Sequence, residues 1–182
     1  LMLFNLSCAY DRVWRDGLLW KLCDSGLSAG IIRWLQVWLC NRINWVKVNG
    51  VRSKSHVFAQ GLPQGSVLSP LLFLVYINDL VICLSERVNV SAFADDLAVS
   101  STGRYVSVCK DSLQWACDDV VSWCNDWLKK LAANKCSVTL FSLNARDASM
   151  SKLCVLLDRY EVRRHLALLG LPLIASLSSR VM

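Results

Sequence analysis

Two adjacent aspartates between two short strand-like segments constrain the fold more than any other feature of this chain. Asp95 and Asp96 follow Phe93 and are flanked by residues 88–92 and 97–100, which carry the β-branched and apolar residues of strands. The pattern predicts a tight hairpin that presents two carboxylates side by side. Neighbouring anions repel each other unless a positive group lies between them, and a divalent metal ion is the usual partner. An exposed Asp-Asp turn without function is the alternative, because such turns are common.

Length and charge indicate one globular domain with a polyanionic partner. The chain has 182 residues, enough to bury a hydrophobic core, and a formal net charge of +6. None of its nine cysteines forms a Cys-x-x-Cys pair, and only two histidines are present. Zinc-binding spacing is therefore absent from the sequence. We interpret the cysteines as small hydrophobic residues of a reduced, intracellular protein.

The sequence predicts neither a leader nor a membrane anchor. Residues 1–4 are apolar without a basic leader and are interrupted at Asn5, which indicates a fragment that starts inside a strand. The most apolar segment, residues 67–84, contains Pro70 and Asp79. Its unbroken apolar stretch is too short to span a bilayer and is typical of a buried helix.

Periodicity along the chain predicts the order of the remaining elements. We expect strands at 1–5 and 137–141, helices at about 12–24, from 28, at 70–84 and at about 108–130, and a hairpin at 43–59 centred on Asn49-Gly50. Lys129 and Lys130 would complement the C-terminal dipole of the last helix. Without the inserted helices and hairpin, the order is strand, helix, strand, turn, strand, helix, strand. This order predicts an α+β fold: a ferredoxin-like βαββαβ antiparallel sheet with its helices on one face.

The predicted topology brings distant residues together. In a βαββαβ sheet the end of the first strand lies next to the central hairpin turn, so Asn5 should lie beside Asp95 and Asp96. A two-metal site built from carboxylates would be expected at that point.

Two further segments have the composition of ligand-binding surfaces. Lys47, Arg52 and Lys54 alternate with apolar residues in the 43–59 hairpin, so one face is basic. That face is either solvated or a surface that follows phosphates, and the sequence leaves both open. Residues 60–66 form a glycine- and proline-rich loop that a ligand could approach closely.

Three motifs, in order, carry a family resemblance. Residues 5–14 (NLSCAYDRVW), 61–73 (GLPQGSVLSPLLF) and 93–96 (FADD) closely resemble successive motifs of reverse transcriptases from non-LTR (LINE-type) retrotransposons. Lys135, after Asn134, resembles the lysine of the fourth palm motif. The resemblance covers residues 1–142 and implies a polymerase palm. Residues 143–182 have no recognisable motif and are unassigned, as a divergent or frameshifted tail.

The resemblance implies RNA-templated DNA synthesis, in which a nucleotidyltransferase joins a dNTP to a primer 3′-hydroxyl. Asp95 and Asp96 would bind two Mg²⁺ ions, with Mn²⁺ as the alternative metal. Tyr10, after Ala9, would be the aromatic residue that favours deoxynucleotides, and Lys135 would lie near the triphosphate. The loop that contacts the nucleotide and the template would contain Gly61, Pro63, Gln64 and Gly65.

One departure from the family pattern concerns the metals. The first metal-binding aspartate is replaced by Asn5, whereas Asp11 matches the second, non-catalytic aspartate of that motif. An amide oxygen binds a hard cation more weakly and cannot offset its charge, so transition-state stabilisation should fall by several kcal/mol. We therefore expect an impaired or inactive copy. The alternatives are a non-catalytic nucleic-acid-binding relic and a translated remnant without a biochemical role; a viral RNA-dependent RNA polymerase is a weaker rival.

The resemblance also implies partners and a location. The partners would be an RNA template, a DNA primer and dNTPs, without a membrane. Fingers, thumb and endonuclease regions, which are not evident in this sequence, would belong to a longer polyprotein. The location would be intracellular, in the nucleus or the cytoplasm.

Overall fold

The structure is a computed structural model that describes residues 1–40, 42–142 and 163–168. It contains two compact units. The sheet unit comprises Leu1–Ser7, Leu80–Asp126 and the chain from Lys130 onward, and the ribbon unit comprises Cys8–Asp79 and Trp127–Lys129. Helix α3, Leu68–Ser85, contributes to both units. Of the tail at 143–182, only a strand at Arg163–Leu168 lies within the described residues.

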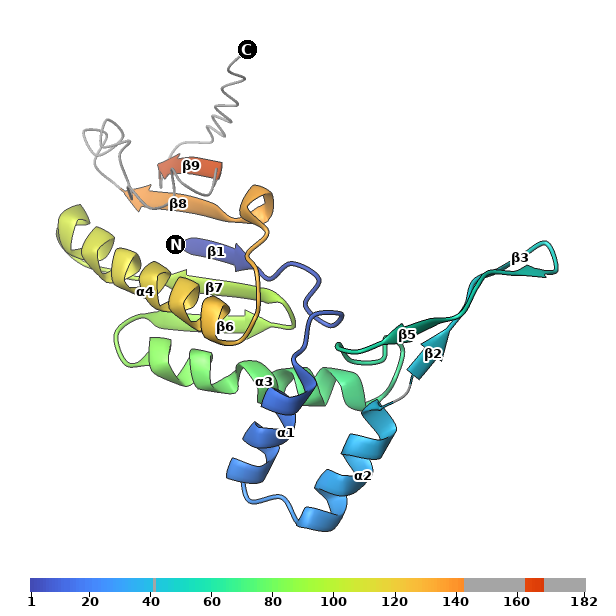
Figure 1. Cartoon of the computed structure of the whole chain (residues 1–182). Helices are drawn as coiled ribbons and strands as arrows, with labels where there is room; N and C mark the ends of the chain where they lie inside the picture. The colour runs from blue at the N-terminus through green and yellow to red at the C-terminus, as the bar shows by residue number, and fades with distance from the viewer. Residues whose placement is uncertain (41, 143–162, 169–182) are drawn as a thin grey trace. The chain divides into compact units, whose positions relative to one another are not determined.

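The sheet unit is built on a five-stranded sheet in the order β6-β7-β1-β8-β9 (Figure 1). The first three neighbouring pairs are antiparallel, and β9 is parallel to β8. The strands are β1 Met2–Asn5, β6 Asn89–Phe93, β7 Asp96–Ser100, β8 Ser137–Ser142 and β9 Arg163–Leu168. The predicted combination of helices with antiparallel strands is therefore confirmed.

Alternating burial gives this sheet one apolar face. Met2 and Phe4 of β1 are buried, and their partners in the register, Val99 and Leu97 of β7, are buried as well. Because side chains alternate between the faces of a strand, these residues form one continuous surface. Helix α4, Val106–Asp126, packs against β7 and lies over this sheet (Figure 1). Its buried residues are Leu113, Ala116, Cys117, Val120, Trp123 and Cys124.

Helix α4 ends before the predicted boundary at residue 130. Its last residue is Asp126, and Leu128 has φ +54°. A right-handed helix cannot continue through a positive φ. The expectation that Lys129 lies in the last helical turn is therefore wrong. A short 3₁₀ helix, η1 at Ala133–Lys135, then leads into β8.

Besides the first part of α3, the ribbon unit contains two helices and a long two-stranded ribbon (Figure 1). Helices α1, Arg15–Asp24, and α2, Ala29–Leu39, pack against each other. In the ribbon β2, Arg42–Asn44, pairs with β5, His56–Phe58, and β3, Lys47–Val48, pairs with β4, Val51–Arg52. Asn49 and Gly50 both have positive φ, +49° and +82°. These values match the type I′ turn predicted from the Asn-Gly pair.

Helix α3 begins and ends within two residues of its predicted bounds. Phe73, Tyr76 and Leu84 are fully buried, as expected for a core helix. By length and hydropathy alone, α3 is also the one helix in the described residues that could cross a membrane, a property that it shares with many core helices of soluble proteins.

Candidate active site

The predicted Asp-Asp hairpin is present in the sheet unit. Phe93 of β6 pairs with Asp96 of β7, which leaves Ala94 and Asp95 as the two turn residues. Ala94 has φ +51°, a value that a residue with a Cβ adopts at some cost. The turn backbone is fixed from outside the hairpin as well, because Leu6 N donates a hydrogen bond to Asp95 O at 3.0 Å. The sequence thus folds locally into a tight turn with two adjacent carboxyl groups.

Strand β1 brings Asn5 to this turn, as the topology predicted. Asn5 lies opposite Asp96 in the β1–β7 register. Its side-chain Nδ2 donates hydrogen bonds to Asp95 Oδ2 at 3.2 Å and to Asp96 Oδ1 at 2.6 Å. Its backbone carbonyl accepts a hydrogen bond from Ala132 N at 2.8 Å, which holds the end of β1 in place.

The Asn5 amide offsets part of the repulsion between the two aspartates. Hydrogen bonds to ionised carboxylates are stronger than those between neutral groups, and this N–H group points at both anions. Asp95 is half-buried and Asp96 is exposed. The two carboxyl groups therefore have an amide donor beside them, in the position where the family resemblance expects another carboxylate.

The donor set does not fit a centre of two divalent ions. Mg²⁺ prefers oxygen ligands, and Asp95 and Asp96 supply carboxylates, but Asn5 directs an N–H donor at them. Rotation of the amide would present its oxygen, yet the site would still carry two negative charges against the four positive charges of two ions. Among the described residues, no group of three or more His, Cys, Asp or Glu side chains could hold a metal ion.

Lys135 is the fourth residue expected at this site. It ends η1, and its side chain is exposed. The one ion pair found in the described part of the chain joins Lys21 to Asp79. Lys135 is thus in the same unit as Asp95 and Asp96, but no ion pair joins it to either aspartate in the part of the chain described.

The expected nucleotide-contacting residues lie in the ribbon unit. The loop at residues 61–65 is joined to the turn at residues 9–13 by backbone hydrogen bonds, from Gly61 N to Val13 O and from Leu62 N to Tyr10 O, both at 2.8 Å. The start of the loop therefore has a fixed position relative to the Ala9-Tyr10 turn, and Pro63 and Gly65 follow in the same loop.

Gly61 and Gln64 of this loop both lie against Asp11. Gly61 has φ +86°, and a Cβ there would lie 2.6 Å from the carbonyl oxygen of Asp11. Gln64 Nε2 donates a hydrogen bond to Asp11 Oδ1 at 2.9 Å. The second aspartate of the first motif therefore holds the loop.

Arg15 also fixes this loop, a role that the sequence analysis missed. Its guanidinium donates to three backbone carbonyl oxygens: Nε to Gly61 at 2.9 Å, Nη1 to Phe58 at 2.8 Å and Nη2 to Gln60 at 3.0 Å. The planar fork of an arginine suits several carbonyl groups at once. No spacing in the sequence gives this contact, because the acceptors lie more than forty residues away and are main-chain atoms.

Tyr10 has an aromatic partner and a buried cation near its backbone. Its ring stacks on Phe73 with centroids 5.0 Å apart. Lys129, only 4% exposed, donates a hydrogen bond from Nζ to Ala9 O at 2.6 Å. The same Nζ lies 5.5 Å from the centroid of the Phe73 ring. Lys129 thus supports the Ala9-Tyr10 turn, whereas the sequence analysis assigned it to a helix dipole.

A second buried lysine stabilises the ribbon unit. Lys21 is 8% exposed, and its Nζ donates to Asp79 Oδ1 at 2.6 Å and to Tyr76 O. It also lies 3.5 Å from the centroid of the Trp127 ring. Burial lowers the pKa of Lys21, and the hydrogen bond and charge of Asp79 act in the opposite direction.

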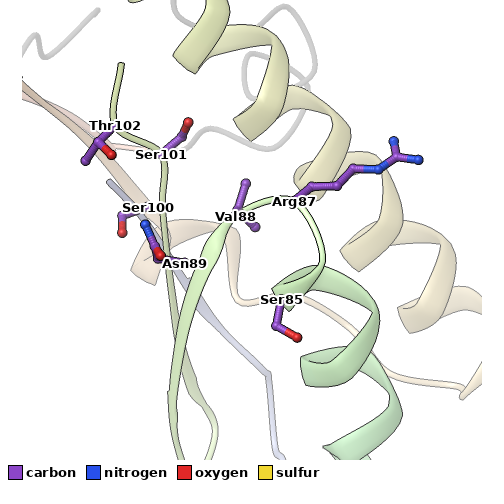
Figure 2. A pocket seen from close by; sticks show the side chains of 7 residues that line it. All are labelled: Ser85, Arg87, Val88, Asn89, Ser100, Ser101 and Thr102. Atoms are coloured by element: carbon purple, nitrogen blue, oxygen red, sulfur yellow. The ribbon is translucent and has the colours of Figure 1, made fainter. Parts of the chain in front are cut away.

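A polar pocket of about 280 Å³ lies at the far end of the β6–β7 hairpin from the aspartates (Figure 2). Hydroxyl and amide side chains line it, together with Arg87 and Val88. In Figure 2 the Arg87 side chain extends away from the other labelled side chains. Its guanidinium lies 4.1 Å from the centroid of the Trp115 ring. The pocket therefore has no inward-facing charge, and it is not the site at Asp95.

Comparison with known proteins gives the family. The reverse transcriptase (RNA-dependent DNA polymerase) family matches residues 1–173, which extends past the motifs that end near residue 142. The chain is 32% identical over 149 residues to the RNA-directed DNA polymerase from mobile element jockey of Drosophila funebris, and 31% identical over 144 residues to that of Drosophila melanogaster. It is 29% identical over 174 residues to a probable RNA-directed DNA polymerase from transposon BS of Drosophila melanogaster.

Coverage differs between the chain and these relatives. The three matches cover 79%, 76% and 90% of this chain, but only 16%, 16% and 19% of the relatives. The chain thus spans less than a fifth of the length of the curated relatives that it matches. The resemblance to polymerases of non-LTR retrotransposons is confirmed, and the chain belongs to the reverse transcriptase family.

Proposed function

We propose that this chain is the palm of an RNA-directed DNA polymerase of a non-LTR retrotransposon, with residues 1–142 forming the palm and residues 143–182 a divergent tail. One observation carries the proposal: Asn5, Asp95 and Asp96, which occupy two of the matched motifs, meet through hydrogen bonds at the ends of neighbouring strands. Motifs ninety residues apart in the sequence thus share one site.

The strand order supports a ferredoxin-like palm topology. The strands β6-β7-β1-β8 are neighbours in that order, and α3 and α4 connect β1 to β6 and β7 to β8 in the chain. A βαββαβ sheet has its first and third strands in the centre, as β1 and β7 are here.

The reaction proposed for the parent enzyme is transfer of a nucleotide from a dNTP to the 3′-hydroxyl of a DNA primer on an RNA template. In the parent enzyme Asp95 and Asp96 would hold the Mg²⁺ ions, which would supply Lewis-acid chemistry for the hydroxyl and the phosphates. Tyr10 and the loop of Gly61 and Gln64 would select and orient the nucleotide, and Lys135 would lie near its triphosphate. We further propose that the activity of this copy is impaired, because Asn5 leaves the site with two carboxylates.

Primer extension tests this proposal. Residues 1–142 would replace the matching segment of a jockey polymerase, once as they are and once with Asn5→Asp, and extension of a DNA primer on RNA would be measured with Mg²⁺ and then with Mn²⁺. The expected result is incorporation by the Asn5→Asp chimera and a rate at least about 100-fold lower with Asn5, the scale of a lost electrostatic group at a reacting centre. Equal activity of both chimeras would show that Asn5 is not at the metals.

A second candidate is a nucleic-acid-binding protein without catalysis. The observation that favours it is that the side-chain amide of Asn5 donates hydrogen bonds to both carboxylates. Binding of RNA that weakens with salt, without incorporation by either chimera, would select this candidate.

For both candidates we propose an intracellular location, nuclear or cytoplasmic, and a longer parent protein with fingers, thumb and endonuclease regions.

A further inference from the structure

The ribbon lies in a part of the sequence that has no acidic residue. Between Asp24 and Asp79 the chain contains no Asp or Glu, but it contains Arg33, Arg42, Lys47, Arg52 and Lys54. This segment therefore carries five positive charges and no negative charge, whereas the net charge of the whole chain is +6. The positive potential of the protein is therefore concentrated on this segment.

The register of the ribbon separates its cations from its valines. Lys47 pairs with Arg52, and Val48 pairs with Val51. Because successive residues of a strand point to opposite faces, Lys47 and Arg52 share one face and the two valines share the other. One face of the ribbon tip is thus basic and the other is aliphatic.

The same pairing continues toward the base of the ribbon. Ser53 N donates to Val46 O, and Val46 N donates to Ser53 Oγ, both at 2.9 Å. Trp45 lies beside the Arg52 guanidinium, and Lys54 follows Arg52 by two residues in the segment that leaves the strand, so we group both with Lys47 and Arg52. We call these four residues, Trp45, Lys47, Arg52 and Lys54, the basic face. All four side chains are exposed.

The basic face has the properties of an anion-binding surface. Lys47 and Arg52 lie directly opposite each other, and like charges in that position destabilise a strand pair unless an anion lies near them. The Arg52 guanidinium lies 5.1 Å from the centroid of the Trp45 ring, a contact that orients the cation. Basic groups beside an exposed aromatic ring are typical of surfaces that bind a nucleic acid backbone and stack a base.

We propose that the basic face binds the sugar–phosphate backbone of a single-stranded nucleic acid, using residues that are separate from those of the candidate active site. The inference rests on the proposed function only for the class of ligand. Lys47, Arg52 and Lys54 contact phosphates, and Trp45 stacks on a base. The aliphatic face of Val48 and Val51 takes no part in this contact.

The test is the salt dependence of binding by the full chain to a fluorescent single-stranded RNA and to a single-stranded DNA of mixed sequence. Three phosphate contacts contribute about −2 to the slope of log K against log salt, which is about a 16-fold loss of affinity between 50 and 200 mM salt. The double variant Lys47→Ser/Arg52→Ser is expected to lower the magnitude of that slope by about 1.4 on both strands. A stronger effect on one strand would identify RNA or DNA as the preferred source of the phosphates.

Three matched variants make the result decisive. Lys47→Arg/Arg52→Lys keeps the charges and is expected to keep the slope. Arg104→Ser/Lys110→Ser removes the same charge from the sheet unit, and Val48→Ser/Val51→Ser alters the aliphatic face; both are expected to leave the slope unchanged. Circular dichroism checks that each variant is folded.

Two outcomes would overturn the inference. One is an unchanged slope in the Lys47→Ser/Arg52→Ser variant. The other is an equal loss in the sheet-unit variant, which would mean that binding depends on total charge alone. Either outcome is independent of primer extension by the chimeras, so failure of this inference and failure of the proposed polymerase activity can be distinguished.

Discussion

Asn5→Asp is expected to lower the free energy of unfolding in the absence of divalent metal and to make it depend on Mg²⁺. The unaltered Asn5 donates hydrogen bonds to Asp95 at 3.2 Å and to Asp96 at 2.6 Å. An aspartate cannot donate when ionised, so both bonds are lost and a third negative charge is added within the same site.

The magnitude follows from these two changes. Hydrogen bonds to charged groups contribute about 1.5 to 3 kcal/mol each. For the two hydrogen bonds together we take the lower limit, about 1.5 kcal/mol, because Asp96 is exposed and water can replace the amide donor. Two new repulsions at about 4 Å cost about 1 kcal/mol each in a watery environment. The expected loss is therefore about 3.5 kcal/mol at low salt, and less at high salt because the charges are screened.

Bound Mg²⁺ should reverse much of this loss. A ligand that binds only the folded state at ten to one hundred times its Kd adds about 1.4 to 2.7 kcal/mol to the free energy of unfolding. The free energy of unfolding of the unaltered chain should respond much less to Mg²⁺. Its Asn5 amide donates hydrogen bonds to both aspartates, and its site has one negative charge fewer. The assay is urea unfolding followed by tryptophan fluorescence, first in EDTA and then with increasing MgCl₂.

Two control variants separate the contributions. Asn5→Ala removes the donor without adding charge and should be destabilised without responding to Mg²⁺. Asn44→Asp adds the same charge on the exposed ribbon and should change little. The reasoning is refuted if Asn5→Asp unfolds at the same urea concentration as the unaltered chain in EDTA and Mg²⁺ shifts neither transition.

Three further predictions concern the ribbon unit and use urea unfolding. Gly61→Ala should cost about 2 to 4 kcal/mol, because its Cβ would meet a carbonyl oxygen at 2.6 Å, whereas Gly65→Ala, with positive φ but open space, should cost about 1 kcal/mol; equal costs would contradict the close approach. Arg15→Lys should cost about 1 to 2 kcal/mol, because an ammonium cannot reach three carbonyls in a planar fork, and full stability of this variant would exclude that role. Asp79→Asn should lower the pKa of Lys21 further, so its stability deficit should be largest at pH values where Lys21 is protonated in both folded proteins and should shrink as the pH rises through the lowered pKa of Lys21; a deficit independent of pH would argue against the ion pair.

The candidate active site could be predicted from the sequence to the extent that it depends on strand order. Alternating residues on both sides of Asp95 and Asp96 determine a hairpin locally, and the strand order expected from the sequence places the end of the first strand beside that hairpin. In the structure the pairing of β1 with β7 brings Asn5 into contact with both aspartates. The expected proximity of Lys135 to the site is not accompanied by an ion pair with Asp95 or Asp96 in the described residues.

The supports of the Ala9-Tyr10 turn and of the 61–65 loop could not be predicted. Lys129 and Arg15 donate to backbone carbonyl oxygens, which every residue has, so no pattern of side chains indicates them. The end of helix α4 was also missed, because amphipathic periodicity continues to residue 127 while Leu128 adopts a positive φ. Lys129 lies beyond the end of the helix, and its Nζ donates to Ala9 O.

The sequence by itself determined the family motifs, the β-hairpins and the amide residue, Asn5, at the end of the first strand, because these features depend on residue type and short-range spacing. The tertiary structure alone decided that the Asn5 amide donates to both carboxylates, and that Lys21 and Lys129 are buried beside aromatic rings. The physical reason is that a hydrogen bond or a buried cation requires a particular partner within about 3 Å, and folding brings such partners together from distant parts of the chain.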